Sequence, residues 1–310
     1  MKQHILPQQL IESNPGMAFS LRALLTKLLD LAQLTKPEIM LLVVLTGATA
    51  VVMEGSLLHE PLKFAAIILG LELAGGSANA LNQYFEREID ARMSRTRRKR
   101  PLPLGKVTPN EALAFALTIG ISSVAIFGLM FNWLAAGLAA ATILFYSLYY
   151  TLWLKPRTHL NIVIGGAAGA MAPIIAWAAA TGEVSVTAWL LFGIIFLWTP
   201  PHFWSLALCL KRDYETVRMP MLPVVKGDDE TRKQIFIYTL WLLALSLGLM
   251  WLGAGGFYLV SALGLGGTFA WKAFRIWRQG EAAEAWGLFK YSIVYLMSLF
   301  VALMVDKAIG

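Results

Sequence analysis

The chain has 310 residues, of which 57% are hydrophobic and only 15% are charged, and its formal net charge is +7. A mean hydropathy of +0.62 is too high for a water-soluble domain, because part of each helix in such a domain must face water. The single cysteine, Cys209, excludes an internal disulfide and any cysteine-based metal cluster. We therefore predict an all-α integral membrane protein.

Apolar stretches of about 20 residues, the length that crosses a bilayer, recur along the chain. The polar residues 1–35 form an N-terminal extension, in which 17–36 is amphipathic enough for a helix on the membrane surface. Residues 36–310 are predicted to form a single transmembrane domain. Its nine predicted spans lie at 38–54, 63–84, 109–131, 133–153, 161–181, 187–210, 233–255, 257–275 and 287–307.

Lys and Arg residues gather on one side of this topology. With nine spans and a cytoplasmic N-terminus, 23 of the 26 Lys and Arg residues fall in the cytoplasmic segments 1–37, 85–108, 154–160, 211–232 and 272–290, the last of which includes the inner ends of the eighth and ninth spans. The positive charge thus reflects membrane topology and gives no reason to predict nucleic-acid binding. No signal-peptide pattern precedes the first span and few basic residues precede Lys36, so a bacterial inner (plasma) membrane is the expected location.

The second span ends in a polar stripe. Asn82, Glu86 and Asp90 are spaced four residues apart, so on a continuing helix they share one face, with a drift of about 40° per step. An amide and two carboxylates are hard oxygen ligands of the kind that Mg²⁺ prefers, with phosphate and water completing its shell. The stripe therefore predicts a Mg²⁺ site, although carboxylates in surface salt bridges are the alternative.

A basic cluster follows directly and suits phosphate oxygens, which arginine binds in a bidentate manner. We expect Arg95 and Arg100 to bind a diphosphate together with the metal; basic residues that only set the topology are the alternative. The cluster comprises Arg95, Arg97, Arg98, Lys99 and Arg100.

The sixth span carries a second set of polar residues. Pro200 and Pro201 are expected to kink the helix or to interrupt its hydrogen bonds, and His202 follows them within the membrane. His202 is either functional or hydrogen-bonded to a neighbouring helix. At the inner end of the span, Asp213 is placed to face Glu86 and Asp90 and to hold a second metal. The adjacent Lys211 and Arg212 would join the phosphate site.

The Asn-x3-acid-x3-Asp pattern of Asn82, Glu86 and Asp90 resembles that of the UbiA family of intramembrane prenyltransferases. The similarity covers roughly residues 35–305, and further motifs resemble the branch of the family that prenylates haem. These motifs are Asn82–Pro101, Tyr150–Lys155, Asn161–Ala170, Pro201–Trp204, Asp213-Tyr214 and Met221–Pro223.

The resemblance implies a nine-helix transmembrane bundle around a central cavity that opens sideways to lipid. It implies Mg²⁺-dependent transfer of a farnesyl group from farnesyl diphosphate to a vinyl group of haem B, giving haem O for terminal oxidases. Expected partners are the lipid bilayer and haem A synthase or the terminal oxidase assembly. His202 would orient the haem or ligate its iron, and whether one or two Mg²⁺ ions bind stays open.

Two departures from the family pattern are visible. Glu86 stands where many relatives have Asp, and Cys209 stands four residues before Asp213, where quinone-type relatives have a second Asp. The second departure favours the haem branch over a quinone-precursor acceptor. A transporter with intramembrane carboxylates is the alternative from another class, but transporters place such groups near the midplane.

Overall fold

The computed structural model describes residues 15–280 and 282–310, with side chains from Arg22 onward except those of residues 281–283. Over these residues every regular element is a helix, so the predicted all-α class is confirmed. Residues 1–14 of the predicted N-terminal extension lie outside the described residues. The helices are α2 (Pro15–Leu34), α3 (Pro37–Glu54), α4 (Pro61–Arg92), α5 (Ser94–Arg97), α6 (Pro109–Met130), α7 (Trp133–Leu144), η1 (Phe145–Leu154), α8 (Asn161–Gly169), α9 (Ala172–Thr181), α10 (Val186–Cys209), α11 (Lys211–Thr216), α12 (Leu222–Val225), α13 (Gly227–Leu247), η2 (Gly248–Leu252), α14 (Gly256–Gln279) and α15 (Ala282–Ile309).

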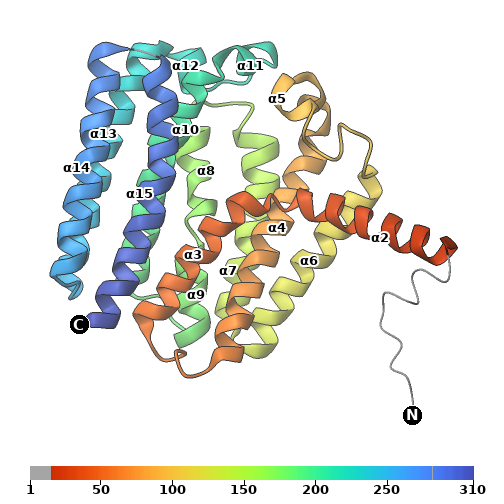
Figure 1. Cartoon of the computed structure of the whole chain (residues 1–310), viewed down its shortest axis with the longest axis horizontal. Helices are drawn as coiled ribbons and strands as arrows, with labels where there is room; N and C mark the ends of the chain where they lie inside the picture. The colour runs from red at the N-terminus through yellow and green to blue at the C-terminus, as the bar shows by residue number, and fades with distance from the viewer. Residues whose placement is uncertain (1–14, 281) are drawn as a thin grey trace.

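The long helices form a bundle of membrane-crossing length. Eight helical runs in the described chain are long and apolar enough to cross a bilayer. Outside these eight runs, α14 has 24 residues and carries Lys272, Arg275 and Arg278 near its C-terminal end, which makes it more polar. It packs against both α13 and α15, so it runs alongside them at one edge of the bundle (Figure 1). The predicted nine-helix membrane bundle thus agrees with the described residues.

The short helices mark one end of this bundle. In Figure 1, α5, α11 and α12 lie together at the top, and the C-terminus lies at the opposite end. The segments that follow the second and sixth spans therefore meet at one end, as their shared basic character predicts. α2 leaves the bundle sideways and is tied to it by a 2.6 Å ion pair between Lys27 and Glu111.

Three predicted spans differ in detail from the structure. α4 continues to Arg92, well past the predicted end at residue 84, so the whole polar stripe is helical. The predicted span 161–181 is divided into α8 and α9, because a glycine-rich stretch is a weak helix former and Pro173 begins a new first turn. α10 stays helical through Pro200 and Pro201, so the two prolines do not end the helix. Each proline lacks a backbone N–H and therefore removes one hydrogen bond within the helix.

The end of the fourth span is a π-helix, η1, which the sequence analysis did not predict. In η1 the Lys155 backbone amide donates to the Tyr150 carbonyl at 2.8 Å, five residues earlier. The wider turn changes which side chains face α4. π-Helical turns are rare and often occur at functional sites.

Close packing of α8 against η1 gives a first prediction. A Cβ atom on Gly165 would lie 2.3 Å from the Tyr150 ring, whereas one on Gly169 in the same helix would meet nothing within 4 Å. We expect Gly165→Ala to lower the free energy of unfolding by about 1–3 kcal/mol through overpacking. Gly169→Ala, the matched control, should change it by less than about 0.5 kcal/mol. Thermal unfolding of the detergent-solubilised protein measures both, and equal stabilities would contradict this packing.

Candidate active site at the end of α4

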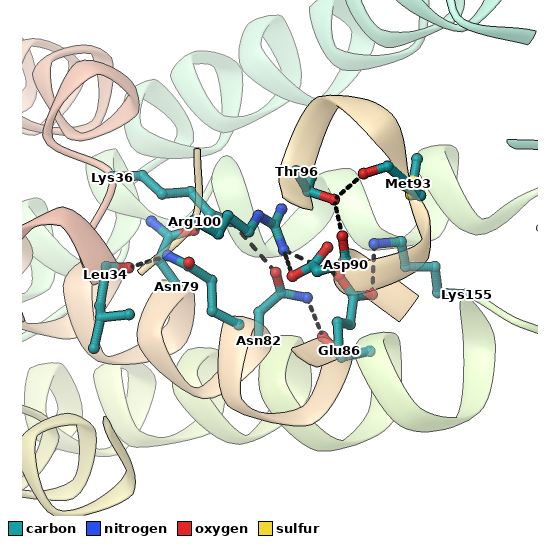
Figure 2. Close-up of polar contacts among 12 residues, drawn as sticks. Leu34, Lys36, Asn79, Asn82, Glu86, Asp90, Met93, Thr96, Arg100 and Lys155 are labelled. Carbon is teal, nitrogen blue, oxygen red and sulfur yellow. Dashed lines mark hydrogen bonds and ion pairs between the residues drawn. The ribbon is translucent and has the colours of Figure 1, made fainter. Parts of the chain in front are cut away.

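The polar stripe of α4 is buried within the bundle. Asn82, Glu86 and Asp90 are 2%, 4% and 2% exposed, and all three belong to the last three turns of the helix. Buried carboxylates need cationic or hydrogen-bonding partners, because desolvation of a charge is strongly unfavourable. The partners come from three other segments of the chain (Figure 2).

The segment after α4 folds back and brings Arg100 to the carboxylates. The Thr96 hydroxyl donates to the Asp90 carbonyl at 2.8 Å, and the Arg100 amide donates to the Thr96 carbonyl at 2.9 Å. The Arg100 guanidinium then forms a hydrogen-bonded ion pair with the Asp90 carboxylate and lies 3.8 Å from Glu86. Arg100, which we predicted as a diphosphate ligand, is therefore inside the site.

Two residues of the η1 segment complete the other side. Lys155 Nζ forms a 2.6 Å ion pair with Glu86 Oε1. The Thr151 hydroxyl accepts a 3.1 Å hydrogen bond from the Asn82 amide and donates to the Tyr146 carbonyl, five residues earlier. The π-helical register thus orients the residues that hold Asn82 and Glu86.

Lys36, between α2 and α3, supplies a third cation. Its Nζ donates to Asn79 Oδ1 at 3.1 Å and to Asn82 Oδ1 at 3.3 Å. Lys36, Asn79 and Lys155 are not among the site residues predicted from the sequence. The sequence offers only a weak indication of their role. Lys36 and Lys155 stand at the inner ends of apolar stretches, where basic residues are expected for membrane topology alone.

The site has an excess of positive charge, since Lys36, Arg100 and Lys155 face Glu86 and Asp90. Burial, and then the neighbouring Arg100, lower the pKa of Lys36 to about 7. Burial also disfavours charge on Lys155, but the Glu86 carboxylate outweighs it and raises the pKa of Lys155. A bound anion would favour the charged form of both amines.

The other predicted phosphate-site residues lie further out. Asp213 accepts a 2.8 Å hydrogen bond from the Ser94 hydroxyl, which ties α11 to the start of α5. Lys211 forms a 2.8 Å ion pair with Asp228, and Arg95 and Arg212 are exposed to solvent. The roles of these four residues stay predictions.

Asp213 is not grouped with Glu86 and Asp90. Among the described residues, no three His, Cys, Asp or Glu side chains are placed together as metal ligands. Two carboxylates and one amide oxygen remain, from Glu86, Asp90 and Asn82. This set fits Mg²⁺, which is commonly held by one or two carboxylates together with substrate phosphates.

His202 is buried between α10 and α15. Its ring stacks on Trp198 and Phe289, with centroid distances of 4.3 and 4.7 Å, and its Nδ1 lies 2.7 Å from Ser292 Oγ. Because the Ser292 hydroxyl donates to the Phe289 carbonyl at 2.6 Å, it accepts from His202 Nδ1–H. The hydrogen bond to a neighbouring helix is thus present, and in a neutral imidazole this arrangement leaves Nε2 as the nitrogen without a proton.

A helical membrane bundle with an oxygen-rich, cation-lined site at one end defines a multi-pass membrane enzyme suited to a phosphate-bearing substrate. The chain belongs to the UbiA prenyltransferase family, whose model matches residues 40–300. The membrane-protein and family predictions made from the sequence are both confirmed.

Relatives support this assignment at two levels. A protein named protoheme IX farnesyltransferase from Gloeobacter violaceus is 49% identical to the chain, and the match covers 90% of the chain and 92% of the relative. A protein of the same name from Parvibaculum lavamentivorans is 46% identical, and the match covers 91% of the chain and 89% of the relative. A digeranylgeranylglyceryl phosphate synthase structure covers 92% of the chain and 99% of its own, with TM-score 0.75 and 18% identity. A UbiA homologue from Archaeoglobus fulgidus bound to GPP and Mg²⁺ covers 88% and 99%, with TM-score 0.66 and 14% identity. These two structures share the fold.

Proposed function

We propose that the protein transfers the farnesyl group of farnesyl diphosphate to a vinyl group of haem B, producing haem O. The observation that carries the transfer chemistry is the buried contact between Glu86 and Asp90 and the cations Arg100 and Lys155. The choice of haem as acceptor rests on relatives that carry the name protoheme IX farnesyltransferase at 43–49% identity.

Asn82, Glu86 and Asp90 would hold Mg²⁺, and Asp213 would join them or hold a second ion. When bound, Mg²⁺ supplies charge stabilisation for the departing diphosphate. Arg100 and Lys155 now neutralise the carboxylates, and on substrate binding they are placed to neutralise diphosphate oxygens. Arg95, Lys211 and Arg212, at the same end of the bundle, would bind the outer phosphate.

In the reaction, the bond between the allylic carbon and the diphosphate oxygen breaks and a bond from that carbon to the vinyl group forms. Water adds its hydroxyl to the other vinyl carbon and loses a proton, so haem O and diphosphate are released. Tyr146 and Tyr150 stack with ring centroids 5.2 Å apart beside Thr151. Their aromatic faces would stabilise the allylic cation that develops as this bond breaks.

Further predictions complete the proposal. The site end of the bundle faces the cytoplasm of a bacterial inner membrane, and residues 1–35 are an extension of a single transmembrane domain with a central cavity. His202, whose Nδ1 is hydrogen-bonded to Ser292, orients the haem or ligates its iron. Haem A synthase or the terminal oxidase assembly receives the product.

Purified protein incubated with haem B, farnesyl diphosphate and Mg²⁺ tests the proposal, with mass spectrometry of the extracted haem. We expect a product heavier by one farnesyl group and one hydroxyl group, and no product after chelation of Mg²⁺. Prenylation of a quinone precursor with no haem product would instead support the other branch of the family.

A further inference from the structure

The connection between α2 and α3 is strained at Lys36. Its backbone is left-handed, with φ 56° and ψ 66°, and Pro37 follows directly. A side chain with a Cβ disfavours this conformation, and strain of this kind persists only where the surrounding structure enforces it. Only one other described non-glycine residue, Arg218, has a positive φ.

Amide side chains of α4 enforce this elbow. Gln83 Nε2 donates to the Leu34 carbonyl at 2.9 Å, and Asn79 Nδ2 donates to the Thr35 carbonyl at 3.0 Å. Both donors lie on the face of α4 that also carries Asn82 and Glu86. The elbow is therefore fixed to the same helix surface as the proposed metal ligands (Figure 2).

The strained backbone directs the Lys36 amine into the site, where this amine forms no ion pair with a described carboxylate. Among the described residues, Lys36 Nζ donates hydrogen bonds to the neutral amide oxygens of Asn79 and Asn82, whereas Arg100 and Lys155 each pair with a carboxylate. Within the described residues, no acidic side chain lies within ion-pair distance of Lys36. An ammonium has three donors, so one remains for a ligand.

We propose that Lys36 binds the diphosphate of the prenyl substrate directly, from the α3 side of the site and next to the metal ligand Asn82. The inference rests on the proposed function and adds a substrate-binding residue to it. An anion that bridges the metal and Lys36 would be held between α3, α4 and the Arg100 segment. The strained elbow then serves to present the amine.

Two variants separate this role from a structural one. Lys36→Gly removes the amine and relieves the left-handed strain, because glycine adopts positive φ readily. Lys36→Asn does the same less completely, since Asn also tolerates this conformation. Lys99→Met is the matched control, because Lys99 is an exposed cation of the same basic segment.

The experiment measures binding of inorganic pyrophosphate with Mg²⁺ to the full-length protein in detergent by calorimetry, together with thermal unfolding. We expect at least a tenfold weaker affinity in Lys36→Gly and Lys36→Asn, at unchanged or higher stability, and less than a twofold change in Lys99→Met. Wild-type affinity for pyrophosphate in both Lys36 variants would overturn the role of Lys36 and leave the proposed function standing. Loss of stability that accompanies loss of binding in both would show a structural role and overturn it too. Failure of the wild-type protein to bind pyrophosphate would overturn the proposed function as well.

Discussion

Replacement of Asp90 by Asn is expected to lower the rate of farnesyl transfer by about 100- to 1,000-fold. The carboxylate is 2% exposed and paired with Arg100, and an amide of the same shape cannot supply the negative charge that a divalent cation requires. The measurement is the initial rate of haem O formation at saturating substrates, with the Mg²⁺ concentration varied.

Glu88→Gln is the control for this substitution. Glu88 belongs to the same turn of α4, but its side chain is 79% exposed and lies 3.8 Å from Arg87. Its loss should change the rate by less than about twofold, because exposed ion pairs contribute little. Full turnover by Asp90→Asn would remove Asp90 from the metal site.

Lys155→Met is expected to have the second large effect, on stability as well as on rate. The Lys155 and Glu86 side chains are 18% and 6% exposed, and removal of one partner leaves a buried charge with only the more distant Arg100. We expect the free energy of unfolding to fall by about 3 kcal/mol. The rate should fall by about 100-fold, because one cation at the leaving group is lost.

The double variant Glu86→Gln/Lys155→Met separates these two effects. Replacement of both charges removes the unpaired carboxylate, so stability should recover by about 1–2 kcal/mol relative to Lys155→Met. The rate should stay low, because a metal ligand is also missing. A double variant that is less stable than both single variants would contradict the ion pair described here.

The helices and the α4 stripe could be predicted from the sequence because both depend on local periodicity. Apolar stretches of bilayer length gave the spans, and a spacing of four residues placed Asn82, Glu86 and Asp90 on one face. The prediction for Asp213 depended instead on contact between distant helices. Asp213 lies against Ser94, at the predicted end of the bundle, but is not grouped with the two carboxylates.

The cationic half of the site could not be predicted in the same way. Arg95 and Arg100 are the same residue type in the same basic cluster, so the sequence does not distinguish them. The chain folds back through Thr96, which turns Arg100 inward and leaves Arg95 in solvent. Lys155 reaches Glu86 because η1 is π-helical, and a pattern of apolar residues does not predict that register. Lys36 depends on an enforced left-handed backbone, which tertiary contacts determine.

Binding of Mn²⁺, a substitute for Mg²⁺, tests the central claim most directly through electron paramagnetic resonance. With pyrophosphate added, the wild-type protein should bind Mn²⁺ with hyperfine coupling to phosphorus, and Glu88→Gln should match it. The double variant Glu86→Gln/Asp90→Asn should lose both the bound ion and the coupling. An unchanged phosphorus-coupled signal in that variant would place the metal diphosphate elsewhere in the protein.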